Sequence, residues 1–354
     1  MNIILDCDLM RFPNSGLYHY CLNLGQTVSS LMQEQEKSSF YGPASIAAGF
    51  GEGFHVIPEK KGWLGRFRPF LKRCDIWHAP FQSGRVVPDP RRNPGIRILL
   101  TIHDLNALHE GKPPAEQQRS LAHTQSLIDR SHALVCISEF CRQDVLQHCE
   151  TGNRPVFVIH NGTHKVGESL LASDDYKPSR PFVFGMGYIN RKKNYHVLLP
   201  LLKNEEIEMV IAGRLDEPDY VDQLLQTARS MGVIERLHLP GPVSEQAKSW
   251  YLKNCLAFVH PSLAEGFGAP VVEAMQFGRP LFLSSLTSLP EIAGEAAFYF
   301  RNFEGDHLQQ VFHQGMEIFH SNGMAEKIKE KGRQYDWQLK GKQYLELYRE
   351  LSSL

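Results

Sequence analysis

The chain has 354 residues, with 38 Lys or Arg against 39 Asp or Glu, which gives a formal net charge of −1 at pH 7. This near balance gives the chain no overall positive charge of the kind typical of nucleic-acid-binding proteins, so we expect no nucleic-acid partner. The length exceeds one ordinary hydrophobic core and suits two domains. The amino terminus lacks a charged leader and no apolar run approaches the roughly 18 residues of a membrane span, so we expect a cytoplasmic protein.

Seven cysteines are present, and several of them lie inside apolar runs. Their number is odd, and no pair has the tight spacing of zinc ligands. The sequence therefore predicts reduced thiols in the protein core, and it predicts no metal site.

Short apolar runs alternate with helical stretches along the whole chain, the pattern of parallel sheets covered by helices. In the first half we expect strands at 2–5, 75–78, 97–102, 133–137 and 156–159, with helices at 16–31, 116–130 and 139–149. The segment 163–180 is rich in Gly, Ser, Asp and Pro and is typical of a linker.

The second half repeats the alternation. We expect strands at 182–185, 208–212, 237–239, 257–259 and 280–284, and a helix at 195–202. The last stretch, 336–351, has apolar residues at helical spacing, so it must pack against another element.

Two glutamates, Glu265 and Glu273, flank a loop with two glycines that follows the expected strand 257–259. The helix after this loop begins near Pro270, because a first-turn proline needs no N–H partner. Free N–H groups at such a helix start attract phosphate, and the carboxylates beside it can accept hydrogen bonds from sugar hydroxyls. This arrangement predicts a nucleotide-sugar site.

The stretch from His260 to Gly294 resembles the donor-binding signature of glycosyltransferase family 4, whose members have the two-domain GT-B fold. The resemblance implies that Glu273 holds the ribose and that Glu265 reaches the transferred sugar, with Gly266, Phe267 and Gly268 forming the donor loop. It also implies an α/β protein of two Rossmann-like parallel-sheet domains that face a cleft, with a C-terminal helix that crosses back to the first domain. We place the acceptor-side domain at 1–165 with the terminal helix 338–354, and the donor-binding domain at 166–337.

Three consecutive bases, Arg191, Lys192 and Lys193, follow the expected strand 182–185. A diphosphate leaving group gains negative charge as its bond breaks, so preorganised cations favour the reaction. By resemblance Lys193 contacts the diphosphate. Many family members carry arginine where this chain has Tyr188, so either Arg191 or Lys192 would supply the second cation.

Further donor contacts are implied at Gly213 and at Pro242, each of which follows a strand of the second half. In the first half, Gly16 allows close approach of the backbone to the donor, and His103 in a His-Asp-Leu motif is implied to touch the transferred sugar. His78 is a weaker candidate of similar position, and Ser138 is first of all a helix cap.

The resemblance implies a retaining hexosyltransferase that needs no cofactor and no metal, with the nucleotide sugar as co-substrate. We expect a glycan or lipid-linked glycan acceptor in bacterial surface polysaccharide, lipopolysaccharide or O-antigen synthesis, and GDP-mannose is the first donor to test. In the mechanism we favour, the leaving phosphate helps to remove the acceptor proton. The alternatives are a GT-B nucleotide-sugar epimerase and a non-catalytic sugar-nucleotide-binding protein.

The segment 60–73 contains six basic residues, several large apolar ones and no acidic residue. This composition suits peripheral contact with an anionic membrane at the inner face of the cytoplasmic membrane. The other interpretation is a basic surface loop with a few apolar anchors.

Overall fold

The computed structural model describes residues 1–12, 15–60, 68–83, 87–163, 167, 169–204 and 206–353. These residues form two compact units, one of Met1–Gly162 with Tyr335–Leu354 and the other of Thr163–Gln334. From the sequence, we placed the domain boundaries after residues 165 and 337, which is three residues beyond the observed boundaries after Gly162 and Gln334. Position 165 itself lies outside the described residues.

The first unit contains a seven-stranded sheet with the order β3-β2-β1-β4-β5-β6-β7, and every pair of neighbours is parallel. Its strands are β1 (Asn2–Asp6), β2 (Lys37–Gly42), β3 (Val56–Pro58), β4 (Ile76–Ala79), β5 (Arg97–Ile102), β6 (Ala133–Cys136) and β7 (Val156–Val158). The central strands β4, β5 and β6 are almost wholly buried, because helices cover both faces of a parallel sheet.

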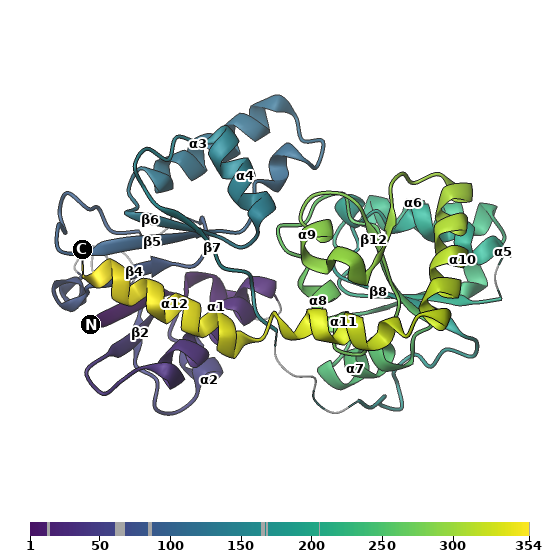
Figure 1. The fold of residues 1–354 in the computed structure, drawn as a ribbon, viewed down its shortest axis with the longest axis horizontal. Coiled ribbons are helices and arrows are strands. Elements are labelled where there is room, and N and C mark those ends of the chain that lie inside the picture. Colours follow the sequence, from purple (N-terminus) through teal and green to yellow (C-terminus); the bar gives the residue numbers. More distant parts are fainter. Residues whose placement is uncertain are drawn as a thin grey trace. The chain divides into compact units, whose positions relative to one another are not determined.

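Helices lie on both sides of this sheet. Figure 1 shows α3 (Pro114–Ile128) and α4 (Glu139–His148) on one side, and α1 (Gly16–Leu31) and α12 (Trp337–Ser352) on the other. The remaining helical segments are α2 (Ile46–Phe50), η1 (Asp8–Arg11), η3 (Pro69–Arg73) and η4 (Asn106–Leu108). None of the described helices in either unit combines the length and apolarity that crossing a membrane requires.

The C-terminal helix α12 packs on the first unit, as the sequence predicts. Tyr344, Leu345, Leu347 and Tyr348 are buried in the same core cluster as residues of α1 and β1. Gly341 allows a close approach to α1, because a Cβ atom there would lie 2.5 Å from Cγ2 of Thr27. The chain therefore returns to its first unit after completing the second, and the two units are not a simple tandem.

A buried hydrogen-bond network joins α12 to the sheet. Nδ1 of His78 lies 2.6 Å from the Tyr348 hydroxyl, and Nε2 of His78 lies 2.8 Å from Oγ1 of Thr101. The hydroxyls of Tyr20 and Tyr344 are 2.6 Å apart. Both ring nitrogens of His78 are thus used inside the core, and the structure makes it a structural residue.

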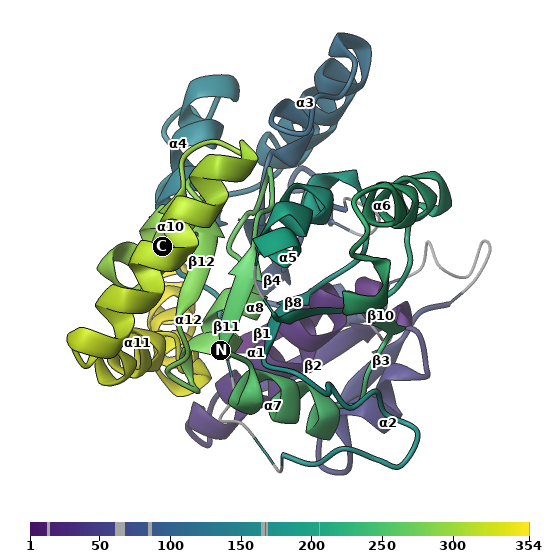
Figure 2. The same cartoon turned by 90° about the vertical axis from the view of Figure 1, so that its right-hand side faces the viewer.

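The second unit contains a six-stranded parallel sheet with the order β10-β9-β8-β11-β12-β13. Its strands are β8 (Phe182–Met186), β9 (Glu208–Ala212), β10 (Leu237–Gly241), β11 (Ala257–His260), β12 (Leu281–Ser284) and β13 (Phe298–Phe300). Residues of α5 (Leu199–Asn204), α6 (Pro218–Ser230) and α10 (Gly305–Ser321) share one core cluster. Figure 2 shows these helices on one side of the strands and α7 (Glu245–Asn254) on the other.

The other helical segments of this unit are short, except for α11. They are α8 (Ala269–Met275), α9 (Leu289–Ala293), α11 (Met324–Arg333), η5 (Arg191–Lys193), η6 (Tyr195–Leu198), η7 (Ile234–Arg236) and η8 (Gly294–Ala296). The single helix expected at 195–202 is instead a 3-10 segment followed by α5. All seven cysteines of the chain are free thiols, as predicted.

The buried His78 makes stability depend on pH. Burial lowers the pKa of His78 to about 3, so the folded protein keeps this ring neutral where the unfolded chain protonates it. Unfolding free energy therefore falls as pH drops below about 6.5, by about 2 kcal/mol at pH 5 for one such histidine.

In the wild type and in His78→Gln, the unfolding free energy is measured with urea at pH 7 and at pH 5. We expect its fall between these pH values to be smaller in His78→Gln, by about 2 kcal/mol. The matched control is His148→Gln, which replaces an exposed histidine of the same unit and keeps the wild-type pH dependence. Equal pH dependence in the wild type and His78→Gln would show that His78 is not neutral in the fold.

Candidate functional site

The second sheet reverses its strand order between β8 and β11, since β9 and β10 lie on one side of this pair and β12 and β13 on the other. Ligands of open parallel sheets bind beyond the carboxyl ends of the strands at such a switch point. The chain leaves β8 into Gly187–Asn194 and leaves β11 into Pro261–Gly268. The fold therefore brings the basic triplet and the glutamate loop to the same edge.

Three side chains from these loops form one buried cluster. Nζ of Lys193 makes an ion pair with Oε1 of Glu265, and Nε2 of His260 lies 2.8 Å from the same carboxylate oxygen. His260 is fully buried at the end of β11, and Glu265 is 8% exposed. A carboxylate is thus held between a cation and a ring N–H at the carboxyl end of the sheet.

The charges of this cluster are fixed by its contacts. Burial alone would raise the pKa of Glu265, but Lys193, His260 and Lys192 together hold this pKa well below its usual range. Burial and the Lys193 charge lower the pKa of His260. At neutral pH Glu265 is therefore an anion, and neutral His260 donates its Nε2–H to it, while His260 Nδ1 has no hydrogen-bond partner among the described residues.

The backbone of Glu265 is held by the loop that follows β12. Its N–H donates to Oγ1 of Thr287 at 2.9 Å, and its carbonyl accepts from Oγ of Ser288 at 2.8 Å. Thr287 has a positive φ of 53°, which is a strained conformation for a β-branched residue. The loop at 284–290 thus positions Glu265, a role that the sequence did not reveal.

The loops after β8 and β11 are also joined to each other. The N–H of Leu263 donates to the carbonyl of Lys192 at 2.8 Å, and the Asn194 amide donates to the carbonyl of Pro261 at 3.3 Å. Asn190 caps the short segment η5 by accepting from the N–H of Lys193. These bonds fix the lysine backbone beside the glutamate loop.

Glu273 lies on α8, and Lys248 of α7 is its ionic partner. Nζ of Lys248 is 3.0 Å from Oε2 of Glu273 and 2.7 Å from Oε2 of the exposed Glu245. Burial alone would lower the pKa of Lys248, but Glu273 and Glu245 together raise it. Lys248 is therefore a cation that contacts the carboxylate expected to hold the ribose.

At two positions of the predicted donor site, the backbone itself requires glycine, for a different reason at each. A Cβ at Gly213 would lie 2.0 Å from the carbonyl oxygen of Gly187, so only glycine fits where the loops after β8 and β9 meet. Gly268 has φ +88° just before α8 and faces Leu289. Gly266 and Phe267 are buried in the same loop, whereas Pro242 is exposed just beyond β10.

The two candidates for the second cation differ in their contacts. Arg191 is exposed, and its side chain reaches α6, where it contacts Glu217, Gln223 and the face of the Tyr220 ring. Lys192 is half-buried, and its charge contributes to the low pKa of Glu265. Lys192 therefore acts on the charge of Glu265, whereas the side chain of Arg191 is held by residues at α6.

In the first unit, His103 follows β5 at the carboxyl edge of that sheet. Its Nε2 lies 2.8 Å from the carbonyl oxygen of Pro80, and its ring packs edge-on against Tyr20 and Phe81. Burial lowers the pKa of His103 to about 4, so the ring is neutral at pH 7 and Nε2 carries the proton. His103 can position a hydroxyl, but it cannot supply a positive charge.

Gly16 is the exposed first residue of α1, capped by Ser15, and apart from its chain neighbours and its own helix no described residue has an atom within 4 Å of where its Cβ would be. Its position is compatible with a close approach by a ligand. Ser138 caps α4 by accepting from the N–H of Cys141, which confirms the helix-cap interpretation.

Sequence reasoning missed three contributors to the site, namely Lys248, His260 and Thr287. His260 stands in the motif but had been given no role, and Lys248 is one lysine on an amphipathic helix with no local signal. Among the described residues, no three His, Cys, Asp or Glu side chains come together as a metal site.

Comparison with protein families gives two consecutive matches. Residues 25–164 match the model described as glycosyltransferase family 4, and residues 172–335 match the model described as glycosyl transferases group 1. Together they extend over most of each unit.

Two curated relatives are mannosyltransferases of Escherichia coli. O-antigen chain mannosyltransferase B is 24% identical over 345 residues, which is 84% of this chain and 85% of that protein. The serotype-specific mannosyltransferase WbdA is 28% identical over 184 residues, which is 47% of this chain but only 22% of WbdA.

Among solved structures, the complex of the Anabaena protein HepE with UDP-glucose matches with a TM-score of 0.76 at 19% identity, over the full length of both chains. At this identity the likeness shows the fold alone. The expected pair of parallel-sheet domains, with the terminal helix returning to the first, is confirmed.

The cluster predicts how stability responds when Lys193 is removed. Lys193→Met leaves Glu265 as a largely buried anion with one hydrogen-bond partner, so we expect unfolding free energy to fall by ~3 kcal/mol at pH 7. The deficit relative to wild type should shrink as pH is lowered towards 5, because Glu265 can then be protonated without loss of an ion pair. Denaturant unfolding at both pH values measures this.

The matched control is Lys327→Met, which removes the exposed ion pair with Glu295 at 2.9 Å. Exposed pairs contribute little to stability, so this variant should unfold like the wild type. Equal effects of Lys193→Met and Lys327→Met would contradict the buried cluster.

Proposed function

We propose, from the premise that this chain belongs to glycosyltransferase family 4, that it is a retaining hexosyltransferase with GDP-mannose as the first donor to test. The premise rests on the two family matches, which together run from residue 25 to 335 apart from a short interval. The chain is thus a glycosyltransferase. The donor, the stereochemistry and the acceptor are the proposal.

The observation that carries the proposal is the buried Lys193–Glu265–His260 cluster at the switch point of the second sheet. A cation and a carboxylate at one site suit a sugar diphosphate, because one group can contact phosphate and the other can accept from sugar hydroxyls. Glu273 on the helix that follows supplies a second carboxylate, for the ribose. We assign Lys192 as the second phosphate cation, since Arg191 is engaged with α6.

The proposed reaction breaks the bond between the anomeric carbon and the leaving phosphate oxygen and forms a bond from that carbon to the acceptor oxygen on the same face. The proton of the acceptor hydroxyl passes to the leaving phosphate, so no enzyme base is needed. Lys193 and Lys192 stabilise the charge that grows on the diphosphate. Neutral His103 of the first unit orients a hydroxyl of the transferred sugar.

Mannose is proposed because two of the relatives are mannosyltransferases, one of them named for the O-antigen chain. We extend this to a glycan or lipid-linked glycan acceptor in surface polysaccharide synthesis. The UDP-glucose bound to HepE makes UDP-sugars the main competing donor class.

Donor binding tests the proposal. GDP-mannose should raise the unfolding temperature of the protein by more than UDP-, dTDP- or ADP-sugars do, because a ligand that binds only the folded state stabilises it, by about 2.7 kcal/mol at 100 times its Kd. The shift should be lost in Glu273→Gln. The matched control is Glu245→Gln, which removes the other, exposed carboxylate on Lys248 and should keep the shift.

A larger shift with a UDP-sugar would replace the donor assignment. If the donor still raises the unfolding temperature of Glu273→Gln, the carboxylate of Glu273 does not contact the donor. Turnover of the donor to an epimer without acceptor would instead identify an epimerase, and donor binding with no turnover under any condition would identify a binding protein.

Metal dependence and stereochemistry give a separate test. Transfer should persist after chelation with EDTA, because Lys193 and Lys192 supply the positive charge that a metal would otherwise provide. Proton NMR of the first product should show the anomeric configuration of the donor. Loss of transfer on chelation with recovery on adding a divalent ion, or inversion at the anomeric carbon, would contradict the mechanism.

A further inference from the structure

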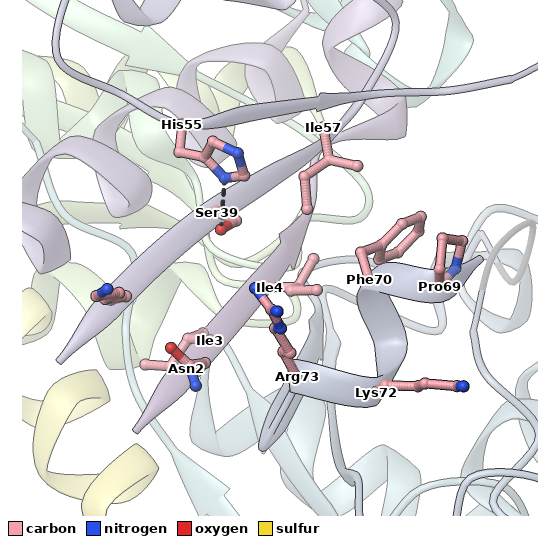
Figure 3. Close-up of a pocket in the computed structure, with 11 residues that line it drawn as sticks. Asn2, Ile3, Ile4, Ser39, His55, Ile57, Pro69, Phe70, Lys72 and Arg73 are labelled. Carbon is pink, nitrogen blue, oxygen red and sulfur yellow. Dashed lines mark hydrogen bonds between the residues drawn. The ribbon is translucent and has the colours of Figure 1, made fainter.

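A solvent-open cavity of about 740 Å³ lies in the first unit, at the amino ends of β1 and β2. Its lining is mixed. Ile4, Ile57, Pro69 and Phe70 contribute apolar surface, whereas Lys37, Lys72 and Arg73 contribute positive charge. Figure 3 shows η3 beside the strands, with Arg73 extending from it towards them and Phe70 beside Ile57.

The cavity exists because the helices on this face cover only part of the sheet. Residues of α3 and α4 pack with β4, β5 and β6, and Ile4 and Tyr41 extend the same core cluster towards β1 and β2. Over β1 and β2 the same cluster includes η3, whose Phe70 packs against the ring of Tyr41 at 5.4 Å between centroids. Among the described residues, Ile57 and Phe70 are only half-buried, so the cavity keeps some apolar surface that solvent can reach.

The basic residues at this cavity are not neutralised within the described chain. Lys37, Lys72 and Arg73 are exposed, and none of them forms an ion pair with a described residue. The neighbouring Asp75 accepts from the backbone N–H of Asn2 at 2.7 Å, and Glu36 is paired with Arg349. Ser39 and His55 are bonded to each other at 2.9 Å at the other end of the cavity. The cavity is thus surrounded by three exposed bases, by the exposed carboxylate of Asp75 and by the half-buried side chains of Ile57 and Phe70.

We propose that this cavity docks on anionic phospholipid at a membrane surface. The three bases would contact lipid phosphates, for which a guanidinium and ammonium groups are suited, and Phe70, Pro69 and Ile57 would contact the apolar region beneath the headgroups. The charge complementarity favours an anionic lipid over a zwitterionic one. This places the membrane-binding surface at residues 37 and 69–73, and only partly in the segment 60–73, of which 61–67 lie outside the described residues.

The location leaves the reactive edge of the first unit free. The cavity is at the amino ends of β1 and β2, whereas His103 follows the carboxyl end of β5, and the strands of this parallel sheet are roughly 17 Å long. Docking at one edge therefore does not occupy the other. An enzyme held in this way would meet lipid-linked acceptors at the membrane, but the docking itself does not depend on the proposed donor or reaction.

Vesicle flotation tests the proposal on the full-length protein without donor or acceptor. Wild-type protein should float with vesicles of phosphatidylglycerol mixed with phosphatidylcholine, and not with phosphatidylcholine alone. The triple variant Lys37→Gln, Lys72→Gln, Arg73→Gln should lower the partition coefficient about 100-fold, because each base near such a surface contributes about fivefold.

The matched control is Lys177→Gln, Lys203→Gln, Lys253→Gln, which removes the same charge from exposed positions of the second unit and should bind within about twofold of the wild type. Thermal unfolding of both variants verifies that each is folded. The proposal would be overturned if phosphatidylglycerol did not increase vesicle binding of the wild type, or if the two triple variants lost vesicle binding equally. Release by sodium phosphate beyond that caused by sodium chloride at the same ionic strength would also overturn it, by indicating a site for free phosphate.

Discussion

The ion pair between Lys193 and Glu265 is the interaction on which the donor-side site depends. It joins the loop after β8 to the loop after β11, the two strands between which the sheet reverses its order. Two charges taken out of water are stable only when each is closely partnered, so neither side chain can leave without cost to the other. His260 gives the carboxylate a second hydrogen-bond partner. The same constraint that stabilises the fold therefore keeps a cation and an anion in place at the edge where we propose that a sugar diphosphate binds.

The two carboxylates of the site have different surroundings, which is consistent with different roles. Glu265 is almost fully buried, its backbone is held by Thr287 and Ser288, and its charge is fixed by Lys193. Glu273 is more accessible, and its partner Lys248 is shared with an exposed carboxylate. A carboxylate fixed in position, such as Glu265, suits contact with the reacting sugar, where geometry matters most. A more accessible carboxylate whose lysine partner is shared, such as Glu273, suits contact with the ribose.

Sequence patterns located the long helices α1, α3 and α12, but they gave no bounds for α6 or for the 17-residue α10. The helix 16–31 and the strand 97–102 were placed at their observed bounds, because their apolar periodicity is continuous. Strands β2, β3 and β13 were missed, since β2 (Lys37–Gly42) begins with three polar residues and the other two are only three residues long. Contacts between side chains distant in sequence, such as Lys248 with Glu273, leave no local pattern. The cavity between η3 and the strands depends on how the helices pack on the sheet, which the sequence does not reveal. The composition of residues 60–73 indicated only its positive charge.

Whether Glu265 acts on the transferred sugar is tested by the dissociation constants of GDP and of GDP-mannose for the wild type and Glu265→Gln, together with the transfer rates of both proteins. If Glu265 faces the transferred sugar and Glu273 the nucleotide, Glu265→Gln binds GDP at least as tightly as the wild type, because Lys193 loses its competing carboxylate, but it loses the added affinity for the sugar and nearly all transfer. The amide keeps the size of the side chain and removes the charge that Lys193 pairs with. Unchanged transfer in Glu265→Gln, or an equal loss of GDP and GDP-mannose binding, would show that the cluster only stabilises the fold.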